Sequence, residues 1–322
     1  MRHMLTLDAT IVIVGVPTAL GGHLSGMEHS PADLRALGLV AAIRDRPLLE
    51  DATIRDAGDL TIEPGFVPDP DPRAKNRARI CEFLPRERDL VARVLAPATG
   101  EVAVEGAVGA APGPRLLIVG GDCTAHAGAM AGLRRSRPDQ RLAIAWFDAH
   151  GDFNTPDTTP SGNVWGMPFA MLCGRGDPDL VAASDGPTVM EAHAALIGGQ
   201  VLDETESRAI ATSAVAQFGS GMLATSAGMA ALAAWAGAVA REVDALYIAF
   251  DMDCLDASGD WAVTMPEPGG LSLPTALAAV RTLAMAIPLA GFGATAVTIA
   301  NGDGPKTVQA VAQLAEAAFA PG

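Results

Sequence analysis

Two clusters of acidic residues, each directly following an apolar segment, could bind a metal ion. They comprise Asp148, His150 and Asp152 at alternate positions, and Asp251 and Asp253 with the same spacing. Successive side chains of an extended segment alternate between its faces, so this spacing directs such ligands into one cleft. Carboxylates with one imidazole suit manganese, nickel, iron or zinc, and bridging aspartates are typical of two-metal sites. The alternative is that the acidic residues only cap strand ends.

Continuous apolar segments precede these clusters and recur along the chain. The candidate strands are Ile11–Val14, Leu116–Val119, Leu142–Phe147 and Leu246–Phe250. Such runs are typical of parallel strands that are covered on both faces. Between them lie the candidate helices, which are Pro31–Asp45, Pro85–Leu95, His126–Arg137 and Met229–Arg241. The alternation predicts an α/β fold, a doubly wound parallel sheet with helices on both faces and functional loops at the carboxyl ends of its strands.

The length and composition fit one large domain. The chain has 322 residues, of which 49% are hydrophobic, so we expect residues 1–322 to form a single α/β domain. Two segments rich in proline and polar residues, 68–79 and 97–114, are predicted to be surface loops within it.

The charge and the cysteines restrict partners and location. A formal net charge of −15 argues against binding to nucleic acid or an anionic membrane, and it fits a cationic substrate. The four cysteines show no metal-binding or redox spacing, and we expect reduced thiols. The N-terminal segment lacks the features of a signal peptide. These properties predict a cytoplasmic protein.

Short motifs in a fixed order link the chain to a known family. They are Gly15-Val16-Pro17, Ser30–Arg35, Asp56–Leu60, Gly120-Gly121-Asp122, Phe147–His150, Ser161-Gly162-Asn163 and Phe250–Asp253. In these motifs the sequence resembles the ureohydrolases, the family of arginases and agmatinases, whose members split a guanidino group with a metal-bridging hydroxide. The resemblance covers almost the whole chain. It implies the three-layer α/β/α fold of that family.

The resemblance also implies two metal positions, one of which is altered. One ion would be held by Asp148, His150, Asp251 and Asp253, and the other by Asp148, Asp152, Asp251 and a histidine. Cys123 stands in place of that histidine. As a thiolate at a helix start it would favour zinc, but it could instead be a small, inert buried residue. His126 is a poor replacement because it lies about 4.5 Å further along the helix. We expect at most one tightly bound ion, either manganese or nickel, or zinc if Cys123 is a ligand.

Two further family positions have changed, while the substrate loop is partly retained. Trp165 replaces a histidine that shuttles protons or orients substrate, and Thr298 replaces a glutamate that pairs with the guanidinium. The residues that the resemblance assigns to substrate binding are Asn154, Ser161 and Asn163, which match carboxylate-binding positions of arginases, and Asp203, which matches a residue that binds the amino group. Asn and Ser beside Pro and Gly are equally typical of turns. We expect Glu267 to shape its loop rather than to act as a base.

Two functions remain open. The loss of three active-site groups from a retained fold resembles a two-subunit ureohydrolase such as metformin hydrolase, and this chain would then be the structural or allosteric partner of a homologous catalytic subunit. We expect a trimer or hexamer acting on a small cationic guanidino or biguanide substrate. The alternative is a self-sufficient guanidino-compound hydrolase with an altered metal site and substrate.

Overall fold

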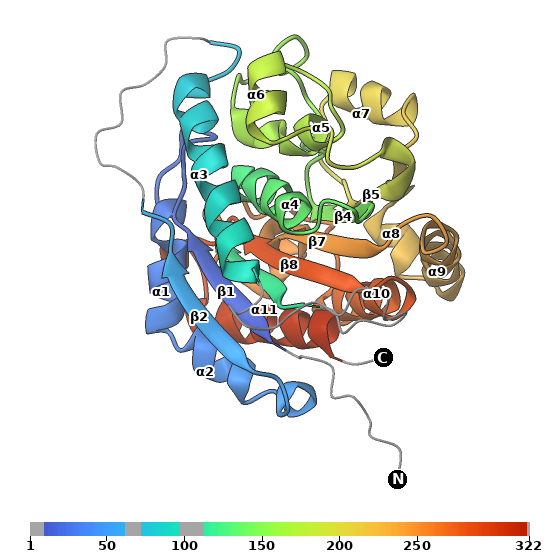
Figure 1. The fold of residues 1–322 in the computed structure, drawn as a ribbon. Helices are drawn as coiled ribbons and strands as arrows, with labels where there is room; N and C mark the ends of the chain where they lie inside the picture. Colours follow the sequence, from blue (N-terminus) through green and yellow to red (C-terminus); the bar gives the residue numbers. More distant parts are fainter. Residues whose placement is uncertain (1–9, 62–71, 97–112, 321–322) are drawn as a thin grey trace.

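The computed structural model describes residues 10–61, 72–96 and 113–320, and a parallel eight-stranded sheet lies at its centre (Figure 1). The strands are β1 (Ile11–Val16), β2 (Ile54–Asp59), β3 (Arg115–Gly120), β4 (Leu142–Asp148), β5 (Ala194–Gly198), β6 (Ala216–Phe218), β7 (Ala245–Asp251) and β8 (Leu289–Thr295). Their order in the sheet is β2-β1-β3-β8-β7-β4-β5-β6, and every neighbouring pair is parallel. The predicted doubly wound α/β fold is confirmed.

The side chains of the central strands alternate between two hydrophobic cores on opposite faces of the sheet. In β1, Ile11 and Ile13 belong to one core, whereas Val12 and Val14 belong to the other, and all four are fully buried. Neither face of such a strand meets water, so both sets of alternate positions must be apolar. This explains why the strand segments read as continuous apolar runs.

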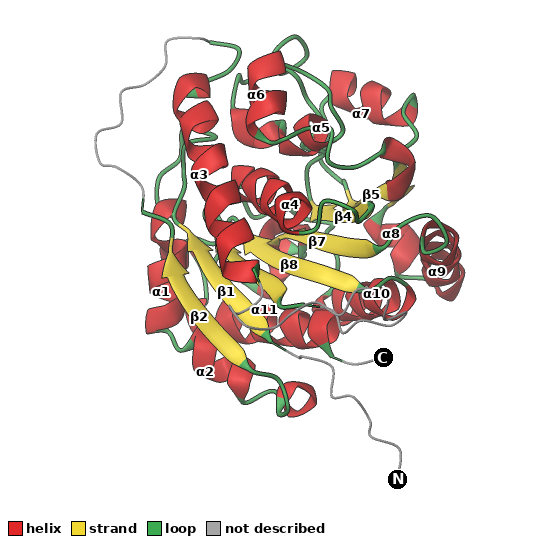
Figure 2. Ribbon diagram, in the orientation of Figure 1, coloured by secondary structure: helices red, strands yellow, loops and turns green. Residues whose placement is uncertain are grey.

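Helices cover both faces and complete three layers (Figure 2). One face carries α3 (Arg77–Leu95), α4 (Thr124–Ser136), α5 (Pro168–Leu172), α6 (Pro178–Ala183) and α7 (Glu204–Ala211), and the other carries α1 (Ser30–Ala36), α2 (Leu39–Arg44), α8 (Ser220–Leu223), α9 (Ser226–Val239), α10 (Leu273–Ala286) and α11 (Gly304–Phe319). Within the described ranges, no helix combines the length and the apolar character that crossing a membrane requires.

Two helix predictions differ from the structure. The predicted start of a helix at Pro85 is wrong, because α3 begins at Arg77 and holds Pro85 in its interior. Packing of buried Phe83 and Leu84 in the core shared with α4 outweighs the helix-breaking tendency of proline. The predicted loop 68–79 is therefore also wrong from Arg77 onward. Residues 68–71 of that loop, and 97–112 of the second one, lie outside the described residues.

The predicted helix Pro31–Asp45 is divided into α1 and α2. The break lies at Gly38, whose φ of 88° is the left-handed conformation that glycine adopts at little cost. Helix α4 begins at Thr124, two residues before its predicted start, and the strands that matter for function, β3, β4 and β7, lie within one residue of their predicted bounds. Their carboxyl ends meet at one edge of the sheet.

Candidate metal centre

The acidic residues at the ends of β4 and β7 lie together. Asp148 and Asp251 follow directly after Phe147 and Phe250, which are partners in the parallel β4–β7 pair. Two groups of residues could each hold a metal ion, and within each group the ligand atoms lie within 4.8 Å of one another: Cys123, Asp148 and Asp251 form the first group, and Asp148, His150 and Asp253 form the second. Asp148 belongs to both groups, so its carboxylate is placed to bridge two ions.

The second group is held together by the imidazole of His150. Its Nδ1 lies 3.3 Å from Asp148 Oδ1 and 3.2 Å from Asp253 Oδ2. Burial lowers the pKa of His150, but hydrogen bonds and charge from the two carboxylates outweigh burial and raise this pKa above its usual value. A proton on the imidazole thus neutralises part of a buried acidic cluster, and a divalent cation bound by the same atoms would take over that task.

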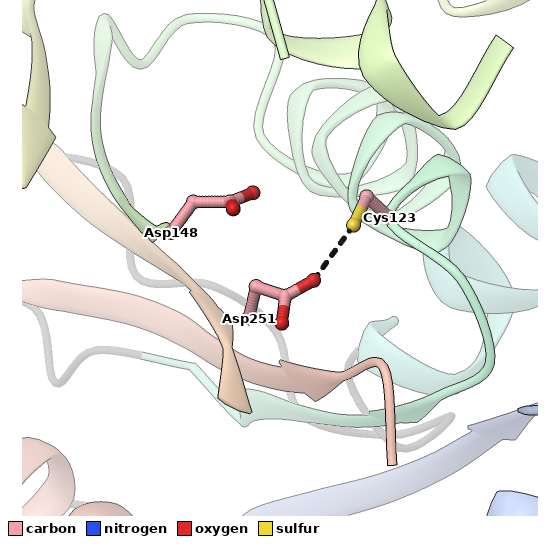
Figure 3. Close-up of side chains that lie close together, drawn as sticks. All are labelled: Cys123, Asp148 and Asp251. Atoms are coloured by element: carbon pink, nitrogen blue, oxygen red, sulfur yellow. Dashed lines mark hydrogen bonds between the residues drawn. The ribbon is translucent and has the colours of Figure 1, made fainter. Parts of the chain in front are cut away.

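In the first group, the thiol of Cys123 forms a hydrogen bond to the carboxylate of Asp251. Cys123 Sγ donates to Asp251 Oδ2 at 2.9 Å, and Asp148 faces the same space (Figure 3). Burial raises the pKa of the Cys123 thiol well above its usual value, and the charges of Asp251, Asp152 and Asp148 raise it further. Cys123 lies at the N-terminus of α4, and its role as a thiolate ligand of a bound metal stays a prediction.

Asp152 lies outside both groups but lines the same cavity. Its carboxylate is buried, and within the described residues Oδ2 has no hydrogen-bond partner. Burial and the charge of Asp148 raise the pKa of Asp152 well above its usual value. A buried carboxylate oxygen without a donor is costly, and a cation would relieve that cost. The donor set of this centre therefore fits a divalent metal.

Trp165 and Thr298, the two further positions at which the sequence departs from the pattern it resembles, differ in their exposure to the cavity. The indole of Trp165 lines the cavity. Thr298 is buried and does not line the cavity. Its Oγ1 lies 2.8 Å from Oγ1 of Thr264, which does line the cavity. His126 is held in the core between the Tyr247 hydroxyl, at 2.9 Å, and Thr295 Oγ1, at 3.0 Å. It therefore does not replace Cys123.

All four residues assigned to substrate binding line the cavity, which has a volume of about 260 Å³. Asn154 Nδ2 donates to Asp203 Oδ2 at 3.0 Å. Ser161 Oγ accepts the backbone N–H of Asn163 at 3.2 Å, which is turn chemistry. Their role as ligands of a substrate stays a prediction. Glu267 lies at the far side of His150, with Oε1 3.8 Å from Nε2.

Two titratable residues of the cavity wall, His23 and Glu206, were not predicted from the sequence. Glu206 lies on α7, its Oε1 accepts the Phe153 N–H at 2.8 Å, and burial raises its pKa to about 7. Its spacing of three from Asp203 is the helical signal that could have indicated it. His23 lies at the rim, with Nδ1 3.1 Å from Asn163 Nδ2 and its ring centroid 5.7 Å from that of Trp165. No motif marked His23.

The fold and the sequence are similar to those of known proteins. The sequence model of the Arginase family matches residues 9–320. An arginase of Bacillus caldovelox is 31% identical over 280 residues, which is 86% of each chain. Arginase-1 of Homo sapiens is 28% identical over 306 residues, covering 93% of this chain and 88% of the human protein. The solved structure of the Bacillus caldovelox arginase gives a TM-score of 0.81 at 27% identity, covering 98% and 99% of the two chains.

Proposed function

Because the chain belongs to the arginase family, we propose that it is a subunit of a metal-dependent ureohydrolase-type complex that hydrolyses a C–N bond of a guanidino or biguanide compound. In this proposal the chain is the catalytically impaired, structural or allosteric partner of a homologous catalytic subunit, in an assembly of the metformin hydrolase type. The observation that carries the proposal is the hydrogen bond from Cys123 Sγ to Asp251 Oδ2.

That hydrogen bond lowers the affinity of the first group, Cys123, Asp148 and Asp251, for a metal ion. A metal ion could use Cys123 only after the thiol lost its proton, and burial among carboxylates opposes that loss. The second group needs no such change, because its ligands are two carboxylates and an imidazole. We therefore propose a single tightly bound manganese or nickel ion, with zinc as the metal if Cys123 ligates. Asp148, His150 and Asp253 would hold such an ion, which would lower the pKa of a bound water and so make a nucleophile available near neutral pH.

The other two departures affect proton transfer and substrate charge. The indole of Trp165 offers one N–H donor and exchanges no proton near neutral pH. Thr298 offers a hydroxyl that is already 2.8 Å from the Thr264 hydroxyl, and a hydroxyl attracts a guanidinium less strongly than a carboxylate does. The chain thus keeps a site that can hold a metal and a cation but lacks groups that would speed hydrolysis.

Helix α9 supports association with another subunit. Its residues Ser226–Val239 include no charged side chain, and Ala227, Ala230, Ala233 and Ala234 are exposed. A helix that is apolar on all sides is usually covered by another surface. We propose a trimer or hexamer with the homologous subunit, with neither nucleic acid nor membrane as a partner. The four free cysteines support a location in the cytoplasm.

Co-purification tests the proposal. The tagged chain is expressed alone and together with an adjacent ureohydrolase gene whose product retains the histidine and glutamate that Cys123 and Thr298 replace. We expect both chains in one peak that survives gel filtration at micromolar concentration, since permanent interfaces bury on the order of 2,000 Å² or more. Recovery of this chain alone, as a homo-oligomer with full hydrolase activity, would contradict the proposal.

That contrary result would support the second candidate function, a self-sufficient guanidino-compound hydrolase with altered metal and substrate. The observation in its favour is the complete group of Asp148, His150 and Asp253 beside a cavity of small-molecule size. Urea release by the isolated chain distinguishes the two candidates.

A further inference from the structure

His150, the imidazole of the second metal group, has carboxylates on both sides of its ring. Asp148 and Asp253 approach the ring at Nδ1, at 3.3 and 3.2 Å, whereas Glu267 approaches it at Nε2, with Oε1 at 3.8 Å. We infer that Glu267 is a positioning residue that acts through His150: its carboxylate orients the imidazole and raises the affinity of the second group for a metal ion. This role rests on the metal site of the proposed function and adds a residue that belongs to neither metal group.

The two nitrogens of the His150 ring face different surroundings. Metal ligation needs a nitrogen that carries no proton, and the nitrogen that faces the other two ligands of the group is Nδ1. The proton of the neutral ring then lies on Nε2, the nitrogen that faces Glu267. A carboxylate beside this N–H fixes the tautomer and the orientation of a metal-binding imidazole and makes the ring a stronger donor to the metal.

The carboxylate of Glu267 is available for this contact. Within the described residues His150 is its ionic partner, and no group there donates a hydrogen bond to it. The side chain of Glu267 is 27% exposed and that of His150 is 23% exposed. Because both groups are partly buried, salt and water screen their interaction less than they screen that of a surface pair.

The backbone around Glu267 is held without help from its carboxylate. Pro266 fixes its own φ, and Pro268 restricts the preceding residue, Glu267, to extended conformations. The carbonyl oxygen of Glu267 accepts the backbone N–H of Ala257 at 3.1 Å, which ties the loop to the segment that follows the ligand Asp253. A substitution that removes only the charge of Glu267 should therefore leave the loop in place.

Manganese titration of the purified, metal-free full chain tests this role, with the free ion measured by electron paramagnetic resonance. The variants are Glu267→Gln, which keeps the size of the side chain but removes its charge, and Glu267→Ala. We expect each to weaken the affinity for manganese by roughly 10- to 100-fold, because loss of such a partner of a metal-binding histidine typically has an effect of this size. The matched control is Glu82→Gln, which removes the same charge at an exposed position of α3 and should leave the affinity unchanged.

Two further measurements separate positioning from a purely structural role. The thermal transition of the metal-free Glu267→Gln chain should equal that of the metal-free parent chain, because a partly exposed ion pair contributes little to stability. With cobalt in place of manganese, the visible absorption spectrum of Glu267→Gln should differ from that of the parent chain, because the donor strength of the imidazole changes. The spectrum of Glu82→Gln should match that of the parent chain.

Two results would overturn the role of Glu267 alone. One is a Glu267→Gln chain that binds manganese as tightly as the parent chain does. The other is a weaker affinity together with a lowered thermal transition of the metal-free variant and an unchanged cobalt spectrum, which would mean that Glu267 only shapes its loop. If the parent chain binds no manganese at millimolar concentration, the metal site of the proposed function fails, and the role of Glu267 fails with it. The two failures can therefore be told apart.

Discussion

Gly22 lies against the indole ring of Trp165, and the ring fits there only because residue 22 has no side chain. A Cβ added at Gly22 would overlap Cε3, Cζ3 and Cη2 of the ring. The two residues are far apart in sequence, one in the loop after β1 and the other in the 3-10 segment Val164–Gly166. The missing side chain at Gly22 therefore leaves the space that the Trp165 ring occupies.

This contact predicts a coupled pair of substitutions. Gly22→Ala should lower the free energy of unfolding by about 1–3 kcal/mol, because the added methyl group overpacks a rigid ring. In a chain that also carries Trp165→Leu the same change should cost much less, which a double-mutant cycle measured by urea unfolding would show. The control is Gly237→Ala, whose Cβ meets open space and should stabilise α9 by roughly 0.5–1 kcal/mol. Strictly additive effects at residues 22 and 165 would contradict the prediction.

Metal content is the second prediction. The purified chain should hold at most one tightly bound ion. Of the two candidate groups among the described residues, the group of Asp148, His150 and Asp253 alone offers ligands that need no thiol deprotonation. Elemental analysis checks this value, and Cys123→His should raise the occupancy. Cys81→Ala, at a half-buried thiol of α3, is the control and should leave the metal content unchanged. Two ions at full occupancy in the parent chain would exclude the single-ion site.

The sequence predicted the framework of the site well, for physical reasons. Strands buried on both faces must be apolar throughout, so polar residues directly after them mark strand ends, as Asp148 and Asp251 do. Parallel order then brings those ends together. Residues such as His23 could not be predicted, because their place depends on how a long loop packs. The position of Pro85 inside α3 likewise depends on packing against α4, which local signals do not contain.

Glu87 of α3 provides a prediction about pH. It is fully buried against Gly128 of α4, and within the described residues neither carboxylate oxygen has a hydrogen-bond partner. Burial, with a smaller contribution from the charge of Asp122, raises the pKa of Glu87 well above its usual value of 4.5. The folded state therefore binds more protons at this residue than the unfolded state does. Its contribution to stability is fully present below about pH 4.5 and is lost as the pH rises through the folded-state pKa.

Glu87→Gln removes this titration. The variant should lose less stability than the parent chain between about pH 5 and pH 8, with each unit of pKa difference corresponding to about 1.4 kcal/mol. Urea unfolding at several pH values gives both curves. Glu82→Gln, at an exposed position of the same helix, is the matched control and should follow the parent chain. Equal pH dependence of Glu87→Gln and the parent chain would show that Glu87 does not titrate in this range.

The isolated chain should be a poor hydrolase, and this is the prediction that bears most directly on function. The loss of one positioned proton-transfer group typically costs about 10² to 10⁴ in rate, and Trp165 occupies the position at which this family carries such a group. Urea release from guanidino compounds should therefore be orders of magnitude slower for the pure chain than for a typical ureohydrolase. Introducing Cys123→His, Trp165→His and Thr298→Glu together should raise the activity of the isolated chain, whereas Cys81→Ala should not. Ordinary turnover by the unmodified pure chain would instead identify a complete enzyme whose catalytic groups lie elsewhere in the cavity.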